Sequence, residues 1–335
     1  MTTNRIDWID TAKGIGILLV VWGHFYASDT LKVIIYGFHM PLFLFLSGYL
    51  YKIQNMPFRL FLSKKCKQLL VPFFVFQIVT FFIVNGLILL ASNQLYSDPM
   101  TLVTQFFFLN GDVGFNSPLW FLVVLFGVEV IFYLFMHFVK KGKWIVVFTI
   151  LLFAFIFSLN EGARITFGIQ ILPLSWLFYY IGFKFRTWQI FNRLGQTWIT
   201  ISLGVILYLS IVFAFNDREI IGFRSNNLGN FFIFIVGAMI GIIVFCLICK
   251  KIGKSVLWGQ FGQHSLLILG THYFFLILYA NVWAMIAGEA IDKAYPIYIT
   301  LPLTIFAFVI YYVGFQLRVF THRSPEKIKK RGELL

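Results

Sequence analysis

Hydrophobic residues fill long runs of the chain, and short polar segments separate one run from the next. A run of about 20 apolar residues is long enough to cross the hydrocarbon core of a bilayer as an α-helix. The pattern predicts about ten such helices, at residues 9–27, 31–51, 68–92, 118–139, 143–159, 169–185, 197–215, 228–249, 264–287 and 295–320. We therefore expect an all-α, polytopic membrane helix bundle, with one integral-membrane domain at residues 1–320 and a basic cytoplasmic tail at residues 321–335.

The composition of the chain excludes two other classes of protein. Of its 335 residues, 60% are hydrophobic and 12% are charged, against roughly 25% charged residues in an average soluble domain. With a mean hydropathy of +0.86, a water-soluble globule could not hide so much apolar surface. Disordered chains are poor in apolar residues, so disorder is excluded as well.

The formal net charge of +14 is explained first by the orientation of the chain in the membrane, and only second by nucleic-acid binding. With the N-terminus in the cytoplasm, most of the 27 Lys and Arg residues fall in cytoplasmic segments. The outer segments hold only Lys32, Arg164, Arg218, Arg224 and Lys293. Because Lys and Arg accumulate in cytoplasmic loops, we expect a multi-pass protein of the cell membrane with both termini in the cytoplasm.

Three cysteines, Cys66, Cys246 and Cys249, are too few for a disulfide framework. Cys246 and Cys249 form a CxxC pair, but the sequence places no second cysteine pair or histidine cluster beside it. We interpret them as small apolar helix residues and expect no metal site.

Lys13 and His24 are ionisable residues on the first predicted helix, where burial without a partner costs several kcal/mol. They are eleven residues apart, close to three helical turns, so both side chains point the same way, about 16 Å apart along the axis. One groove could thus hold an anionic group, such as the phosphate of a thioester, at Lys13 and a reacting group at His24, the natural general base at neutral pH. The structural alternatives are snorkelling of Lys13 to the interface and an interhelical hydrogen bond of His24.

His39 lies on the second predicted helix, two residues before Pro41. Proline removes a backbone hydrogen bond, so we expect a kink at this position. Ser47 and Gly48 should let a neighbouring helix approach closely. If this helix runs inward, His39 and His24 could face each other in the outer half of the bundle. A kinked helix with a buried histidine is typical of a substrate cavity, although a purely structural kink gives the same pattern.

Glu129 and His272 are further ionisable residues within predicted helices. The expected partner of Glu129 is a membrane histidine or Arg164; a carboxylate there either orients a catalytic histidine or makes a packing ion pair. The cytoplasmic loop between the second and third predicted helices holds Lys64, Lys65 and Lys67. These lysines act as a topology signal with anionic-lipid contact, or as a docking patch for a phosphorylated cytosolic donor.

Four motifs around these residues follow one another along the chain. Lys13 and His24 fit the pattern (Arg/Lys)-x10-His, and residues 36–43 with Ser47 and Gly48 fit an FHMPLFF…SG signature. Residues 118–122 contain a Trp-Phe-Leu motif that opens a helix, and residues 262–272 fit G-x-x-S-L-x-I-x-x-x-H. In these motifs and their order the sequence resembles the membrane-bound acyltransferase-3 superfamily, and within it the fucose-4-O-acetylase-like group.

The resemblance implies transfer of an acyl group, usually acetyl, from cytosolic acyl-CoA to a hydroxyl of a sugar or another surface-bound acceptor. The expected catalytic residues are His24, His39 and Glu129. The expected CoA-binding residues are Lys13, Lys64 and Lys67. The expected acceptor-binding residues are Trp120, His272 and Arg164.

The chain departs from the family in the segment that corresponds to the family's CoA contact. Lys64 and Lys67 give Lys-x-x-Lys in place of Arg-x-x-Arg. Lysine keeps the positive charge but cannot bind a phosphate through two parallel hydrogen bonds.

We therefore expect a membrane O-acetyltransferase that uses acetyl-CoA as co-substrate, needs no metal and acts on a surface polysaccharide or lipid-linked sugar. Its expected partners are acetyl-CoA, the saccharide acceptor, the bilayer and proteins of envelope-polysaccharide biosynthesis, and not nucleic acid. Three alternatives stay open: transfer of succinyl or another acyl group to an exopolysaccharide, a membrane transporter or flippase, and a scaffold without catalysis.

Overall fold

The computed structural model describes residues 5–53, 55–92, 100, 116–139, 142–160, 165–216, 218–288 and 294–317. Within these ranges the chain forms helices and no β-strand, apart from two isolated bridges. The all-α prediction is therefore confirmed. Arg164 and the predicted tail at residues 321–335 lie outside the described residues.

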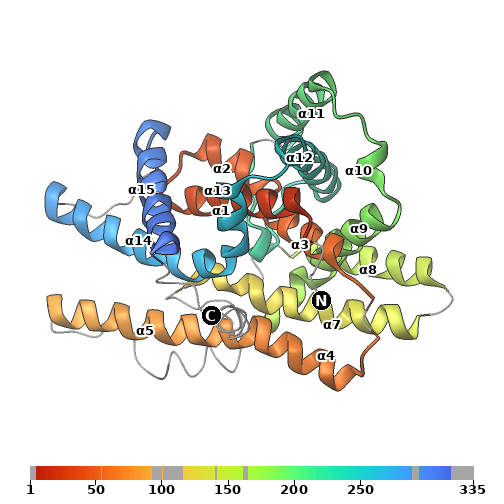
Figure 1. The fold of residues 1–335 in the computed structure, drawn as a ribbon, viewed down its shortest axis with the longest axis horizontal. Coiled ribbons are helices and arrows are strands. Elements are labelled where there is room, and N and C mark those ends of the chain that lie inside the picture. Colours follow the sequence, from red (N-terminus) through yellow and green to blue (C-terminus); the bar gives the residue numbers. More distant parts are fainter. Residues whose placement is uncertain are drawn as a thin grey trace, which may run out of the picture.

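The helices pack around a central pair, α1 and α13, with α14 and α15 on one side and α11 and α12 on another (Figure 1). Their bounds are α1 Asp7–His24, α2 Asp29–Tyr36, α3 His39–Leu50, α4 Phe58–Lys65, α5 Val71–Ser92, α7 Trp120–Phe138, α8 Lys143–Ser158, α9 Leu172–Thr187, α10 Ile190–Arg193, α11 Trp198–Ser210, α12 Phe231–Ile252, α13 Val256–Gln263, α14 Ser265–Ala287 and α15 Ile297–Gln316. Short π- and 3-10-helical turns join them: η1 Cys66–Leu70, η2 Ser117–Leu119, η3 Thr166–Ile171, η4 Ile211–Phe215 and η5 Phe223–Ser225.

Among the described residues, eight helical stretches are long and apolar enough to cross a membrane, which confirms the polytopic class. Two further predicted spans correspond to α1 and α8. In its 18 residues α1 carries Asp7, Asp10 and Lys13, and α8 is apolar but has only 16 residues. The count of ten spans and the cytoplasmic position of both termini stay predictions.

The second predicted span is broken, but not where the sequence indicated. The helix stops at Tyr36, and α3 starts at His39, so the break lies at Gly37 and Phe38. Pro41 lies in the first turn of α3, where a backbone N–H has no partner within the helix and its loss costs little. The expected kink at Pro41 is therefore wrong by a few residues, and the break places His39 at the first position of a helix.

The lysine-rich segment is helical, although we expected a loop. Helix α4 begins at Phe58 and runs through a π-helical turn into α5, ten residues earlier than the predicted span. Phe61 is fully buried and stacks on Tyr133 of α7, with ring centres 4.3 Å apart. This contact holds the segment against the bundle and fixes the directions of its lysines.

Two helix pairs cross at glycines, which brings their backbones into contact. A Cβ atom on Gly14 of α1 would lie 2.0 Å from the carbonyl oxygen of Trp258 in α13, and one on Gly48 of α3 would lie 1.9 Å from that of Tyr179 in α9. The predicted close approach at Gly48 is confirmed, and α9 is the helix that approaches. These crossings hold α1 and α3, the helices of Lys13, His24 and His39, in fixed positions.

Candidate active site

A large cavity opens between α1, α3, α4, α7 and α9, with an empty volume of about 1140 Å³. Its charged lining residues are Arg5, Lys13, Lys52, Lys65 and Arg186, with Asp10 and Glu129. Basic residues thus outnumber acidic ones, and we call this space the basic cavity. Its charge suits a ligand with several negative groups.

Lys13 is the predicted CoA-binding residue that the structure brings into the basic cavity. Its neighbour on the same helix face, Asp10, accepts a hydrogen bond from Gln263 at 3.4 Å, and the ammonium of Lys13 has no ion pair or hydrogen bond within the described chain. An unpaired cation that lines a cavity is available to a bound anion. Lys64 and Lys67 are exposed and do not line the cavity, whereas Lys65 does.

Glu129 is buried and pairs with Lys65, with Oε2 and Nζ 2.7 Å apart. Among the described residues its partner is therefore a lysine and not the expected membrane histidine, and Arg164 lies outside the described residues. The physical reason is that the chain is already helical from Phe58, so that α4 carries Lys65 inward to α7. The pair lines the basic cavity, and a catalytic role of Glu129 stays a prediction.

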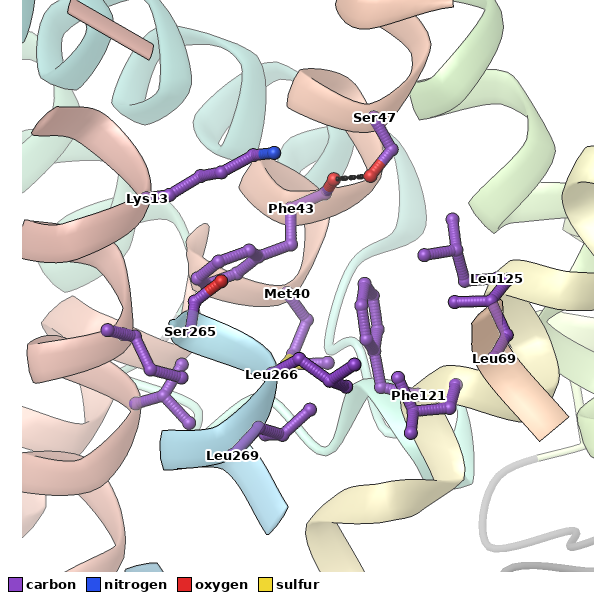
Figure 2. Close-up of a pocket in the computed structure, with 13 residues that line it drawn as sticks. Lys13, Met40, Phe43, Ser47, Leu69, Phe121, Leu125, Ser265, Leu266 and Leu269 are labelled. Atoms are coloured by element: carbon purple, nitrogen blue, oxygen red, sulfur yellow. Dashed lines mark hydrogen bonds between the residues drawn. The ribbon is translucent and has the colours of Figure 1, made fainter. Parts of the chain in front are cut away.

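A second, mostly apolar cavity of about 670 Å³ continues from the basic cavity into the bundle. Lys13 and Ser47 line both cavities. Figure 2 shows Lys13 and Ser47 on one side of this apolar cavity, Phe43 and Met40 along its middle, and Leu269 at the opposite side. The two cavities therefore meet at Lys13.

Three imidazoles and one phenol gather beyond the apolar cavity, from four different helices. The ring of His24 lies 5.4 Å from that of His272 and 6.3 Å from that of Tyr36, between ring centres. Tyr36 lies 4.8 Å from His39 in the same measure. We call these four residues the histidine cluster. His24 and His39 were expected to face each other; in the structure each contacts the ring of Tyr36 instead.

Backbone carbonyl groups fix the orientation of two of the imidazoles. Nδ1 of His39 lies 3.0 Å from the carbonyl oxygen of Ile35, and Nδ1 of His272 lies 2.9 Å from that of Leu269 and 3.1 Å from that of Ile268. A carbonyl oxygen only accepts, so each Nδ1 carries the proton and each Nε2 carries a lone pair when the ring is neutral.

The apolar cavity ends about one helical turn from the histidine cluster. Val20 precedes His24 by four residues on α1, and Leu269 precedes His272 by three on α14; both line the cavity. Residues three or four apart share a helix face. Met40, next to His39, lines the same cavity. A chain-like ligand that enters through the basic cavity would thus be directed at the three imidazoles.

Tyr36 and Gly23 form a brace at the end of α1 that sequence reasoning missed. The Tyr36 hydroxyl donates to the Gly23 carbonyl oxygen at 3.0 Å, and a Cβ atom on Gly23 would lie 2.6 Å from the Tyr36 ring. Helix α1 ends at the next residue, His24. The sequence held a hint of this contact, because Gly23 adjoins His24 and Tyr36 lies three residues before His39. Residue spacing alone, however, does not show which helices touch.

Trp120, predicted to bind the acceptor, lies outside this cavity system. Trp120 is half-buried at the start of α7 and stacks on Phe223, with ring centres 6.3 Å apart, and it lines neither cavity. Within the described parts of the chain, no group of His, Cys, Asp and Glu side chains is arranged to hold a metal ion.

Comparison with known proteins identifies the family. A family model described as an acyltransferase domain, acyltransferase-3, matches residues 6–316. No curated protein and no solved structure gives a match. Since the matched region contains nearly the whole bundle, with the basic cavity and the histidine cluster, the chain belongs to the acyltransferase-3 family and is a multi-pass membrane acyltransferase.

Proposed function

We propose that this protein is an O-acetyltransferase that moves an acetyl group from cytosolic acetyl-CoA to a hydroxyl of a surface polysaccharide or lipid-linked sugar. The observation that supports it most is the order of two cavities that share Lys13 and Ser47 in their linings, of which the apolar one reaches Val20, four residues before His24 on α1. CoA has the same order of parts: phosphates, a flexible pantetheine arm and a thioester.

The phosphate end of CoA matches the lining of the basic cavity. Five basic side chains line the cavity, and Lys13 among them has no ion pair within the described chain. Tyr51 also lines this cavity, and its buried hydroxyl has no hydrogen-bond partner in the described structure, so that it could donate to a bound phosphate. Phosphate recognition here would rest on Lys13, Lys65 and Arg186, with Lys64 and Lys67 outside the cavity.

The pantetheine arm matches the apolar cavity in character. Lys13 and His24 are separated by about 16 Å along α1, so an extended arm with its phosphates at Lys13 brings the thioester toward the imidazoles. Ser47 and Ser265 are polar residues on otherwise largely apolar walls. Their hydroxyl groups can bond to the amide groups of the arm.

His24 acts as the general base in the proposed reaction. Its ring nitrogen takes the proton of the acceptor hydroxyl while the hydroxyl oxygen bonds to the carbonyl carbon of the thioester. The carbon–sulfur bond breaks, and the imidazolium returns the proton to the departing thiolate. A variant of the same chemistry has His24 carry the acetyl group between the two substrates as an acyl-imidazole.

The acceptor side of the site involves His39 and the outer end of α1. Nε2 of His39 carries a lone pair in the neutral ring and can accept a hydrogen bond from a sugar hydroxyl. Trp120 and Arg164 stay predictions as acceptor-binding residues. The class of acceptor rests on the resemblance to the fucose-4-O-acetylase-like group.

The test uses the purified full-length protein in nanodiscs with acetyl-CoA labelled in its acetyl group. We expect transfer of label to a glycan extract from the native cell surface, and no transfer by His24→Ala. His137→Ala is the matched control, because it also removes an imidazole from a helix, but from α7, where His137 lines neither cavity and lies outside the histidine cluster. Normal transfer by His24→Ala would refute the proposal. Mass spectrometry of surface glycans from a deletion strain would then identify the acceptor by the loss of one acetyl mass.

A further inference from the structure

His272 has a polar atom for which the described structure provides no partner. The side chain is 0% exposed, and its Nε2 makes no hydrogen bond. Its other ring nitrogen donates to the carbonyl groups of Ile268 and Leu269. The ring is therefore held as a neutral imidazole whose Nε2 is a hydrogen-bond acceptor in a fixed direction. A buried acceptor without a donor costs free energy, which suggests that it finds one during function.

The ring of His24 lies next to the ring that carries this acceptor. The two ring centres lie 5.4 Å apart with an angle of 39° between the planes. The His24 ring itself makes no hydrogen bond to any described residue. At this separation a modest rotation of the His24 side chain is sufficient to bring one of its nitrogens within hydrogen-bond distance of Nε2. Catalytic hydrogen bonds are often long in the absence of substrate and shorten when it binds.

Other groups that could orient His24 are engaged or lie farther away. Glu129 is paired with Lys65 in the basic cavity. His39 contacts the ring of Tyr36 and makes no ring contact with His24 in the described structure, and the Tyr36 hydroxyl is held by its bond to the Gly23 carbonyl group. Among the described residues near His24, His272 combines proximity with an unused acceptor.

We propose that His272 is the positioning residue of His24, an inference that rests on the proposed role of His24 as the base. Nε2 of His272 accepts a hydrogen bond from one N–H of His24. This bond fixes the tautomer in which the other His24 nitrogen carries the lone pair and faces the substrates. It also stabilises the imidazolium that forms when His24 takes the hydroxyl proton.

His272 neither gains nor loses a proton in this scheme. The acceptor hydroxyl proton passes to His24 and then to the CoA thiolate, and the hydrogen bond to His272 persists throughout. A carboxylate in the same position would place a permanent charge inside the membrane, whereas a neutral imidazole accepts the same bond without that cost. This distinction explains why the buried carboxylate of Glu129 is not the group that orients His24.

Two variants of nearly equal length separate positioning from packing. His272→Gln keeps a side-chain oxygen that can accept from His24, and His272→Met fills similar space with a thioether that accepts only weakly. We expect His272→Met to lower kcat roughly 100-fold and to leave KM for acetyl-CoA and for the acceptor unchanged. We expect His272→Gln to regain about tenfold of that loss.

Three results would overturn the inference: an unchanged kcat in His272→Met, a raised KM for the acceptor at normal kcat, or equal loss in the Gln and Met variants. The first removes any role, the second assigns His272 to acceptor binding, and the third makes its role one of packing. Size-exclusion profiles and thermal unfolding in detergent confirm that each variant is folded. Normal activity of His24→Ala would instead refute the proposed function itself, so the two failures are distinguishable.

Discussion

The basic cavity is lined by five basic and two acidic side chains, whereas the histidine cluster contains three imidazoles and one phenol. One region binds through fixed charge, and the other holds groups that can be neutral and still exchange a proton. A fixed cation attracts phosphates but is a poor base, and an imidazole has the opposite properties. The separation of about three helical turns along α1 lets one ligand use both regions.

The surroundings of the two regions also differ in whether they contain ion pairs. The basic cavity has a tightly paired acid and base, Glu129 and Lys65, next to the unpaired Lys13. The histidine cluster has no ion pair among its members, and backbone carbonyl groups orient two of its rings. Binding and chemistry can therefore be altered independently, and each prediction below affects one region or the path between them.

The largest effect should come from blocking the apolar cavity between the regions. Val20→Trp places an indole about one turn before His24, in the space assigned to the pantetheine arm. We expect acetyl transfer to fall more than about 100-fold, while the phosphorylated adenosine fragment of CoA still binds in the basic cavity. Ile206→Trp, at an exposed position of α11, is the matched control. Normal turnover by a folded Val20→Trp variant would show that the arm takes another route.

Removing the unpaired cation should weaken binding and leave the chemistry intact. We expect Lys13→Met to raise KM for acetyl-CoA about tenfold or more, with kcat little changed, because the lost charge acts on phosphate. Lys13→Arg should retain most of the affinity. The paired control is the Lys64→Met/Lys67→Met double variant, which should behave like the wild-type protein since both side chains lie outside the cavity. Steady-state kinetics at several salt concentrations check both, and a raised KM in the control alone would contradict the assignment.

Breaking the buried ion pair should reduce stability more than activity. Glu129→Gln leaves Lys65 without its partner, and we expect a loss of about 3 kcal/mol in stability, seen as a lower Tm in detergent. The double variant Glu129→Gln/Lys65→Met should recover much of this loss. Activity per folded molecule should fall less than about tenfold. A collapse of activity at unchanged Tm would restore the catalytic role expected from the sequence.

The smallest effect should come from the brace on His24. Tyr36→Phe removes one hydrogen bond to the Gly23 carbonyl oxygen, worth about 1 kcal/mol, and we expect kcat to fall about fivefold. In Gly23→Ala we expect a larger fall in kcat, because the added Cβ atom would displace the Tyr36 ring. KM for acetyl-CoA should not change in either variant. If Gly23→Ala retains full kcat, the position of His24 does not depend on this contact.

The sequence was sufficient for the fold class, and it placed Lys13 and His24 on one helix face; their roles stay predictions. Apolar runs of membrane length predict helices because the bilayer leaves few other structures for a backbone. The spacing of Lys13 and His24 on one helix predicts a shared face because a single helix has a known period. The structure agrees to the extent that Lys13 lines both cavities and His24 lies one turn beyond the apolar one.

Contacts between helices could not be read from the sequence. Lys64, Lys65 and Lys67 look alike in the sequence, and only the burial of Phe61 against Tyr133 decides that Lys65 turns inward. The break before His39 depends likewise on how Gly37 and Phe38 pack, and not on Pro41 alone. Periodicity gives the face of each helix, whereas partners such as Lys65 for Glu129 depend on crossing geometry.

In the proposed reaction, one acyl-CoA molecule occupies both cavities at once. A cryo-EM structure of the protein with bound CoA in nanodiscs tests this most directly. We expect phosphate density against Lys13 in the basic cavity and the CoA sulfur near the imidazole of His24. Density for CoA outside the two cavities, or a pantetheine arm that points away from α1, would contradict it.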